Sequence, residues 1–186
     1  MKALLLSMIV LLSTSSLDAQ TLSGVAISGR LQTCMAGFEK QGFRYVKDNP
    51  HGVTMSGKLY TRPVELYIVV TPRTKTVGKV SLYFPKQKSW SALMNEYEQL
   101  RRQLTKALGT PDQQEATFQL PFKAGDGREL EALRSEKCSY STIWLNKGNT
   151  HAILEISEFL QVYMAVENRE NMELWERERD GKILNE

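Results

Sequence analysis

The chain alternates twice between two hydrophobic periodicities, and this alternation restricts the possible fold more than any other feature of the sequence. The clearest helical pattern is an apolar stripe at 90–108, which lies between Ser89 and Gly109 and repeats every three or four residues. A shorter stripe with the same period spans 29–41, behind a candidate cap at Ser28. Serine favours this position because its hydroxyl accepts a backbone N–H bond. We therefore expect two amphipathic helices.

Both helical patterns are followed by segments in which apolar and polar residues alternate, as they do along a strand with one buried face. The segments after the first helix are 43–46, 53–60, 64–71 and 77–84, and those after the second are 116–122, 138–145, 150–157 and 160–167, with a less regular stretch at 128–133. The connections between most neighbouring segments are short and polar. Antiparallel pairing needs only such turns, whereas parallel pairing needs long crossovers. We therefore expect a mostly antiparallel sheet.

Together these patterns predict an α+β fold. We expect one long sheet built from two tandem helix-plus-four-strand units, at about 23–88 and 89–167, with both helices packed on one face. A short helix at about 169–180 should follow. Because no linker divides the chain, residues 20–186 should form a single domain. The sheet face without helices would then be open, and we expect it to be the functional surface.

The first nineteen residues predict a cleavable export signal. Lys2 provides the positive start, an apolar run follows, and small residues up to Ala19 permit cleavage before Gln20. The apolar run has about 10 residues, whereas a spanning helix needs about 20, so a retained membrane anchor is the weaker alternative. We therefore expect an exported protein, periplasmic or extracellular, with no stable membrane insertion after cleavage.

The chain has two cysteines, Cys34 and Cys138. In an oxidising compartment an even pair favours a disulfide, but a thiol that packs in the core as a small hydrophobe is the equal alternative. Neither cysteine belongs to a Cys-x-x-Cys motif or lies beside a histidine. Catalysis by either thiol is therefore not expected.

The charges are unevenly distributed along the chain. Residues 44–88 hold nine basic and two acidic side chains, a net charge of +7, whereas residues 155–186 hold nine acidic and four basic ones, a net charge of −5. Such asymmetry can attract an anionic or complementary partner, although solvated sheet and helix faces would show it too. Aromatic residues are interleaved with the basic ones, as in polyanion-binding surfaces. Export argues against nucleic acid and leaves a protein or an anionic envelope component as the partner.

An interaction surface on the open face should have aromatic anchors, because aromatic side chains dominate binding hot spots. Basic side chains near them would contact an anionic partner. The candidates are the aromatic residues Tyr67, Tyr83, Trp144 and Tyr163 and the basic residues Arg73, Lys75 and Lys79.

Motifs that carry chemistry do not occur in this sequence. Gly-x-Ser-x-Gly, His-x-x-x-His, the calcium-loop spacing and both standard phosphate-binding glycine loops are all missing. His151 and Glu155 share one strand face, but at about 13 Å apart they cannot form a hydrogen-bonded dyad. We therefore expect no catalytic residues, no cofactor and no metal site.

Several segments carry a resemblance to known proteins: Gly37–Phe43, the Gly78–Pro85 strand that leads to Trp90, the Leu104–Pro111 helix ending, and Glu136–Cys138. In these the chain resembles small secreted proteins of gram-negative gut bacteria that are similar in layout to the beta-lactamase-inhibitor-protein-like (BLIP-like) fold. The resemblance implies two helix-plus-four-strand units in one sheet. No binding loop of the inhibitor matches this sequence, so the resemblance does not imply inhibition.

The function expected from the sequence is therefore non-catalytic binding outside the cytoplasm. The partner would be a protein or an envelope component. The alternatives are an extracytoplasmic enzyme that acts on glycans, which would need two carboxylates in a cleft about 5 to 10 Å apart, and an envelope assembly factor.

Overall fold

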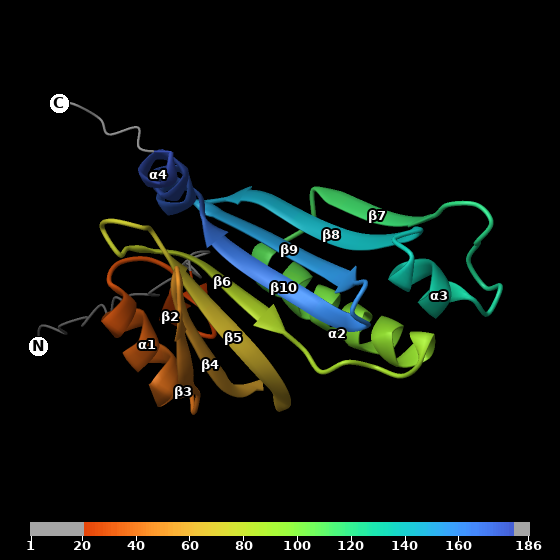
Figure 1. Ribbon diagram of the computed structural model, residues 1–186, viewed down its shortest axis with the longest axis horizontal. Coiled ribbons are helices and arrows are strands. Elements are labelled where there is room, and N and C mark those ends of the chain that lie inside the picture. The colour runs from red at the N-terminus through yellow and green to blue at the C-terminus, as the bar shows by residue number, and fades with distance from the viewer. Residues whose placement is uncertain (1–20, 181–186) are drawn as a thin grey trace, which may run out of the picture.

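The computed structural model describes residues 21–180, with the side chains of residues 146 and 147 excepted. The export signal predicted at 1–19 lies outside these residues. Eight antiparallel strands form one sheet in the order β3-β4-β5-β6-β10-β9-β8-β7 (Figure 1). These strands are β3 (Arg44–Asn49), β4 (Gly52–Leu59), β5 (Arg62–Val70), β6 (Val77–Tyr83), β7 (Gln113–Phe118), β8 (Cys138–Lys147), β9 (Thr150–Ser157) and β10 (Gln161–Asn168).

The strand order joins two four-stranded meanders at the centre of the sheet. Each meander ends on its most buried strand, and these two strands, β6 and β10, pair antiparallel with Tyr83 opposite Tyr163. This arrangement confirms the predicted α+β class and the long antiparallel sheet. The division into two tandem helix-plus-four-strand units stays a prediction.

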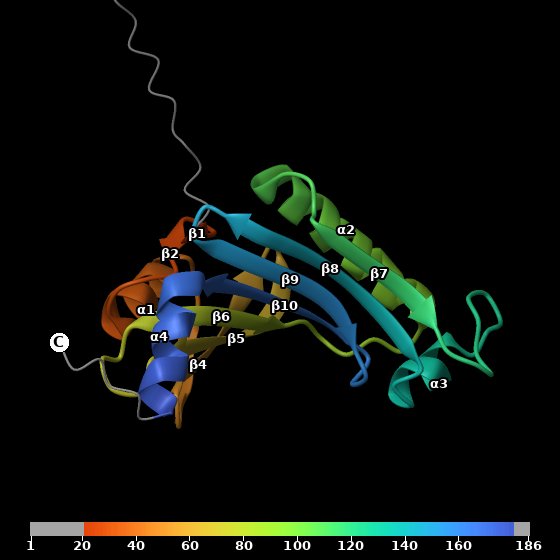
Figure 2. The same ribbon diagram turned by 90° about the horizontal axis from the view of Figure 1, so that it is seen from above.

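The helices lie mostly on one side of the sheet. They are α1 (Leu31–Lys40), α2 (Trp90–Leu108), α3 (Glu129–Arg134) and α4 (Arg169–Arg179). Figures 1 and 2 show α2 on one face of the sheet and α4 on the other. A two-stranded hairpin, β1 (Thr21–Leu22) with β2 (Val25–Ala26), packs against α1. We call the face that carries α1 and α2 the core face and the opposite one the open face.

The helix α2 forms where its apolar stripe predicted it. Ser89 is the N-cap, and its hydroxyl accepts a hydrogen bond from the backbone N–H of Ala92 at 3.2 Å. Gly109 ends the helix with a φ of 83°, a conformation that favours glycine. The stripe buries Leu93, Tyr97, Leu100 and Leu104 against the core face.

The helix α1 begins later than its sequence pattern predicted. Ser28 is not its cap: the helix starts after Arg30, which makes no side-chain capping bond. The backbone before α1 is instead used by the sheet, because Arg30 forms a bridge with Thr76 and the Gly29 carbonyl accepts the Val77 N–H. Pairing with β6 thus takes the residues that could have formed the first turn of the helix.

A single hydrophobic core connects both halves of the molecule. It joins Phe38 of α1 and Leu100 of α2 to strand residues such as Leu66 and Leu82, and each of these side chains is at most 1% exposed. Along β5 the burial alternates strictly from Val64 to Val70, as the sequence predicted. The hydrophobic effect therefore fixes which face of the sheet carries the helices.

Of the two alternatives for Cys34 and Cys138, the structure does not show the disulfide. Both cysteines are free thiols. Cys34 lies in α1 and Cys138 begins β8, and α1 and the α3 end of β8 lie at opposite ends of the molecule (Figure 1). The alternative of a core thiol holds for Cys34, which is 2% exposed. Burial raises the pKa of Cys34 to about 12, and burial and then the charge of Glu129 raise that of Cys138 to about 11.

Reducing agents should therefore leave the stability of the protein unchanged. We expect the thermal midpoint to be the same with and without a thiol reductant, because no bond between the two cysteines exists to be broken. Thiol titration of the unfolded, unreduced protein should find two thiols per chain, and the folded protein should react slowly because only the thiolate is nucleophilic. A lower midpoint in reductant, or no titratable thiol, would contradict this result.

Candidate interaction face

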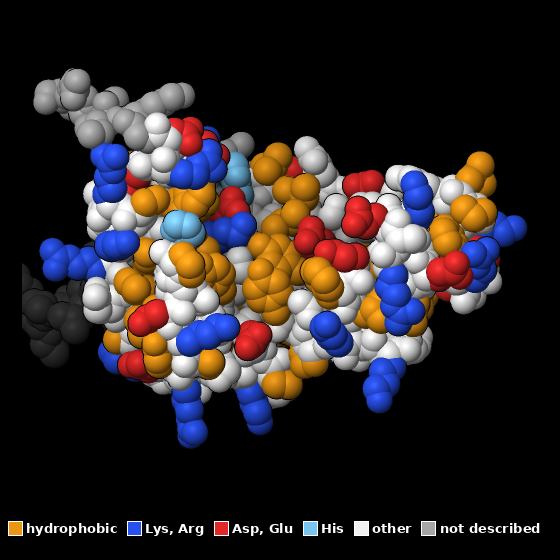
Figure 3. Space-filling model, viewed as in Figure 1, with side chains coloured by type: hydrophobic (Ala, Val, Ile, Leu, Met, Phe, Trp, Pro, Cys, Tyr) orange, Lys and Arg blue, Asp and Glu red, His pale blue; other side chains and the backbone are white. Residues whose placement is uncertain are grey.

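The open face of the sheet has a charge that changes sign across its centre. The register places one row of open-face side chains across all eight strands, in the order Arg44, Ser56, Glu65, Tyr83, Tyr163, Glu155, Ser141 and Glu115. The row begins on the basic segment of the sequence and ends on acidic residues. Figure 3 shows this face, with acidic side chains gathered over β8 and β9 beside an apolar central strip.

Three tyrosines form a ridge along the centre of this face, and we call Tyr67, Tyr83 and Tyr163 the tyrosine ridge. The rings of Tyr83 and Tyr163 have centroids 5.1 Å apart, and the Tyr163 hydroxyl lies 3.1 Å from the Ser81 hydroxyl. Tyr83 is 37% exposed. Burial is the largest cause that raises the pKa of Tyr67 and Tyr83, so both phenols are neutral at physiological pH. The ridge therefore offers apolar ring surface with uncharged hydroxyl groups.

A basic hollow of about 970 Å³ lies on one side of the ridge. Its lining includes three basic side chains, Arg44, Lys58 and Lys86, against one acidic side chain, Glu65. A smaller hollow of about 150 Å³ adds Lys47 and shares Glu65 and Tyr83 with it. The excess of positive charge suits an anionic group on a partner.

An acidic hollow of about 500 Å³ lies on the other side, over β7, β8 and β9. Its charged lining residues are Glu115, Glu136, Glu155, Glu158 and Lys137. Burial raises the pKa of Glu155, and the negative charge of Glu158 raises it further, while the positive charge of Lys79 acts in the opposite direction with a smaller effect. The charged form of Glu155 is therefore disfavoured in the folded protein.

Replacing Glu155 by glutamine should stabilise the protein at neutral pH and have no effect in acid. A carboxyl whose folded pKa lies above its unfolded value of about 4.3 costs stability once the pH rises through the folded pKa. Glutamine removes that cost. Below the unfolded pKa both proteins are neutral at this position, so their stabilities should converge. Denaturant unfolding at pH 7 and at about pH 3.5 checks this, and a less stable Glu155→Gln protein at pH 7 would contradict it.

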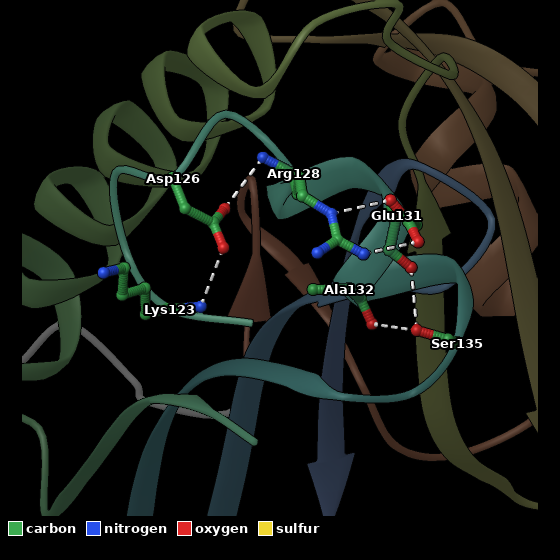
Figure 4. Close-up of polar contacts among 6 residues, drawn as sticks. All are labelled: Lys123, Asp126, Arg128, Glu131, Ala132 and Ser135. Carbon is green, nitrogen blue, oxygen red and sulfur yellow. Dashed lines mark hydrogen bonds and ion pairs between the residues drawn. The ribbon is translucent and has the colours of Figure 1, made fainter. Parts of the chain in front are cut away.

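The end of the acidic hollow is closed by α3, which the sequence did not predict as a helix. The turn before α3 is held by Asp126, whose carboxylate accepts the backbone N–H of Lys123 at 3.1 Å and that of Arg128 at 2.8 Å (Figure 4). Arg128 then donates to Glu131 within the helix at 2.9 and 3.0 Å. This local network sets the position from which Leu133 lines the hollow.

The helix α4 covers one end of the open face, at the beginning of β6. Met172 lies directly over Gly78, where a Cβ would come within 2.9 Å of its sulfur, and the Asn171 amide donates to the Val77 carbonyl at 2.8 Å. Glu178 accepts from the backbone N–H groups of Arg73 and Thr74 in the β5–β6 turn. These contacts fix α4 beside the tyrosine ridge.

The structure brings together four of the seven predicted interaction residues. Tyr67, Tyr83 and Tyr163 form the ridge, and Lys79 lies on the same face, where its ammonium group pairs with Glu167 at 2.8 Å. Arg73 and Lys75 lie apart from them, exposed in the turn that α4 contacts.

The prediction for Trp144 is wrong. This side chain is 0% exposed and points to the core face, where its indole N–H donates to the Gly109 carbonyl at 3.0 Å. It cannot contact a partner in the folded protein. Tyr140, Thr142 and Trp144 share that face of β8, and the Thr142 hydroxyl lies 2.6 Å from the Tyr97 hydroxyl of α2.

Sequence reasoning missed the acidic hollow. Glu115 is far in the chain from Glu155 and Glu158 and meets them only through the pairing of β7, β8 and β9. The one available signal was the position of Glu155 between Leu154 and Ile156 in an alternating strand, which places it on the open face.

Comparisons with protein-family models, with curated proteins and with solved structures find no match to this chain. The resemblance to the BLIP-like fold therefore stays a prediction. No helix within residues 21–180 combines the length and the apolar character that a membrane crossing requires. In the same range, no group of three or more His, Cys, Asp or Glu side chains is arranged to hold a metal ion.

Proposed function

We propose that this is an exported, non-catalytic binding protein whose open sheet face docks a protein or an anionic envelope component. The observation that supports this function best is the tyrosine ridge, which lies uncovered between hollows of opposite charge. Tyrosine is enriched at binding hot spots because its ring contributes a large contact area and its hydroxyl a hydrogen bond. The charges on either side would orient a partner and speed its approach.

The curvature of the sheet favours a partner with a convex surface over a partner with a flat surface. In Figure 2 the strands β8, β9 and β10 bow toward α2, so the open face lies on the inner side of the curve. A convex surface fits such a face with more buried area than a flat surface does. A partner with acidic groups over the basic hollow and basic groups over the acidic hollow would match both shape and charge.

Affinity capture with matched variants tests the proposed function. The tagged chain 20–186 is used to retain partners from the extracytoplasmic fraction of its source, in parallel with a Tyr83→Ala variant and an Arg102→Ala variant. Tyr83 lies on the open face and Arg102 on the exposed side of α2. We expect wild type and Arg102→Ala to retain the same partner and Tyr83→Ala to lose it. Equal retention by all three would overturn the use of the open face.

The basic hollow, rather than the β5–β6 turn, is the place to test an anionic partner. Alanine at Arg44, Lys58 and Lys86 should weaken an anionic partner and reduce the dependence of its affinity on salt, because each removes a charge from the hollow. Alanine at Arg73 and Lys75 serves as the control, since both residues lie in the turn. Partners retained only as a membrane-bound complex would favour the assembly-factor alternative.

A further inference from the structure

The two edges of the sheet are protected to different degrees. An exposed edge strand offers unpaired backbone groups to other chains, and proteins usually block it with bulges, charges or proline. The edge strand β3 has such protection: its register is interrupted by a bulge between Tyr45 and Lys47, and Arg44, Lys47 and Asp48 add charge. A second chain cannot easily continue the sheet there.

The other edge strand, β7, has little of this protection. It pairs with β8 over six residues without a register shift, and its sequence Gln-Gln-Glu-Ala-Thr-Phe contains one charge and neither lysine nor proline. Residues 113–117 are all exposed, and within the described part of the chain β8 is the only strand that pairs with β7. This edge is therefore open to an added strand.

The hydrogen bonds at the end of β7 show which backbone groups face outward. The Gln119 N–H donates to the Lys137 carbonyl at 2.8 Å, which continues the register of Phe118 opposite Cys138. In an antiparallel pair, hydrogen-bonded positions alternate with non-bonded ones. The groups of residues 113, 115, 117 and 119 therefore face β8, and those of Gln114, Ala116 and Phe118 face away from the sheet.

Several registers of two-fold pairing between β7 and a second copy keep side chains on matching faces and use these outward groups. The two that overlap most of β7, five of its six residues, are centred on Glu115 and on Ala116. Centred on Glu115, the pairing would place Glu115 directly opposite itself, and like charges in that position are destabilising. Centred on Ala116, it places Glu115 opposite Thr117 and Gln114 opposite Phe118, with the small Ala116 side chains at the axis. Of these two registers, only the one centred on Ala116 avoids a direct charge conflict.

We propose that two copies of this chain associate through antiparallel pairing of their β7 strands, centred on Ala116. The two eight-stranded sheets then become one continuous sheet of sixteen strands, with both open faces on the same side. This association is independent of the proposed function, but it would present two tyrosine ridges together and so increase the avidity for a partner that carries two copies of its site. The interface is isologous, as in most homodimers.

A charge-swap series tests this register. The glutamate in Thr117→Glu would face Glu115 of the second copy twice in each dimer, so we expect the dimer dissociation constant to rise about tenfold. The double variant Glu115→Lys with Thr117→Glu converts both contacts into opposite-charge pairs and should restore dimerisation. The association is measured by sedimentation velocity of the purified chain 20–186 over a range of concentrations.

Two further variants test whether β7, rather than the other edge strand, forms the interface. Ala116→Pro removes one outward N–H and leaves the bonds to β8 intact, so it should give a folded monomer, with circular dichroism as the check on folding. Lys47→Glu on the edge strand β3 is the matched control and should dimerise as wild type does. A wild-type protein that is monomeric at all concentrations, or a Thr117→Glu protein that dimerises unchanged, would overturn the proposal.

Discussion

Replacing Trp144 by alanine should lower the free energy of unfolding by about 3–5 kcal/mol, the usual cost of removing a large aromatic side chain from a packed core. The indole is 0% exposed, lies between β8 and α2, and donates to the Gly109 carbonyl just past the end of α2. Its loss would leave both a cavity and an unpaired carbonyl. Denaturant unfolding of wild type and Trp144→Ala measures the difference.

The conservative variant Trp144→Phe separates packing from hydrogen bonding. Phenylalanine fills most of the site but cannot donate to Gly109, so we expect a smaller loss of about 1–3 kcal/mol. Neither variant should reduce the affinity of the folded protein for a partner on the open face, because Trp144 points to the core face. A change of less than about 1 kcal/mol in Trp144→Ala would contradict the buried position.

Replacing Tyr163 by alanine should weaken partner binding about thirtyfold or more, since truncation of a hot-spot residue costs about 2 kcal/mol or more. Tyr163 stands at the centre of the open face, with its ring against Tyr83 and its hydroxyl beside Ser81. The variant removes ring surface from the ridge and deprives Tyr83 of its neighbour. Titration calorimetry with the captured partner measures the affinity.

Tyr163→Phe is the matched control for this result. It keeps the ring and its contact with Tyr83 and removes only the hydroxyl, so the affinity should fall much less than in Tyr163→Ala. The same affinity in wild type and Tyr163→Ala would place the binding surface elsewhere.

Most of the fold could be predicted from the sequence because its elements have strong periodicity. The stripe at 90–108 matches α2 residue for residue, and its caps, Ser89 and Gly109, have the predicted roles. Strands such as β5 and β9 alternate cleanly, so their buried faces follow from the sequence alone. The turns between the strands are too short for parallel crossovers, so antiparallel pairing could be predicted. The sheet confirms it.

The wrong predictions arose where the local sequence pattern fits two different structures equally well. In β8 the neighbours Ile143, Trp144 and Leu145 are all apolar, so alternation does not decide which of them faces the core. Packing against α2 decides it in favour of Trp144. The helix α3 is only six residues long, too short to show a periodic apolar stripe, and the turn before it is set by the side-chain bonds of Asp126.

The tyrosine ridge could be predicted in part, but the hollows beside it could not. An aromatic residue on the polar side of an alternating strand can be recognised one strand at a time, as for Tyr67 and Tyr83. The meeting of Tyr83 with Tyr163, and of Glu115 with Glu155 across β8, depends on pairing between segments that are distant in the chain. Such pairing is set by the whole core and has no local signature.

Oxidative footprinting of the tyrosines, with and without the captured partner, tests the open face as the binding surface most directly. Tyr83 is 37% exposed on the open face, and Tyr45 is 47% exposed at the β3 edge, opposite the core residue Met55. If the partner docks on the ridge, oxidation of Tyr83 and Tyr163 should fall in the complex while that of Tyr45 stays unchanged. Protection of Tyr45 with unchanged oxidation of Tyr83 and Tyr163 would contradict the proposed binding surface.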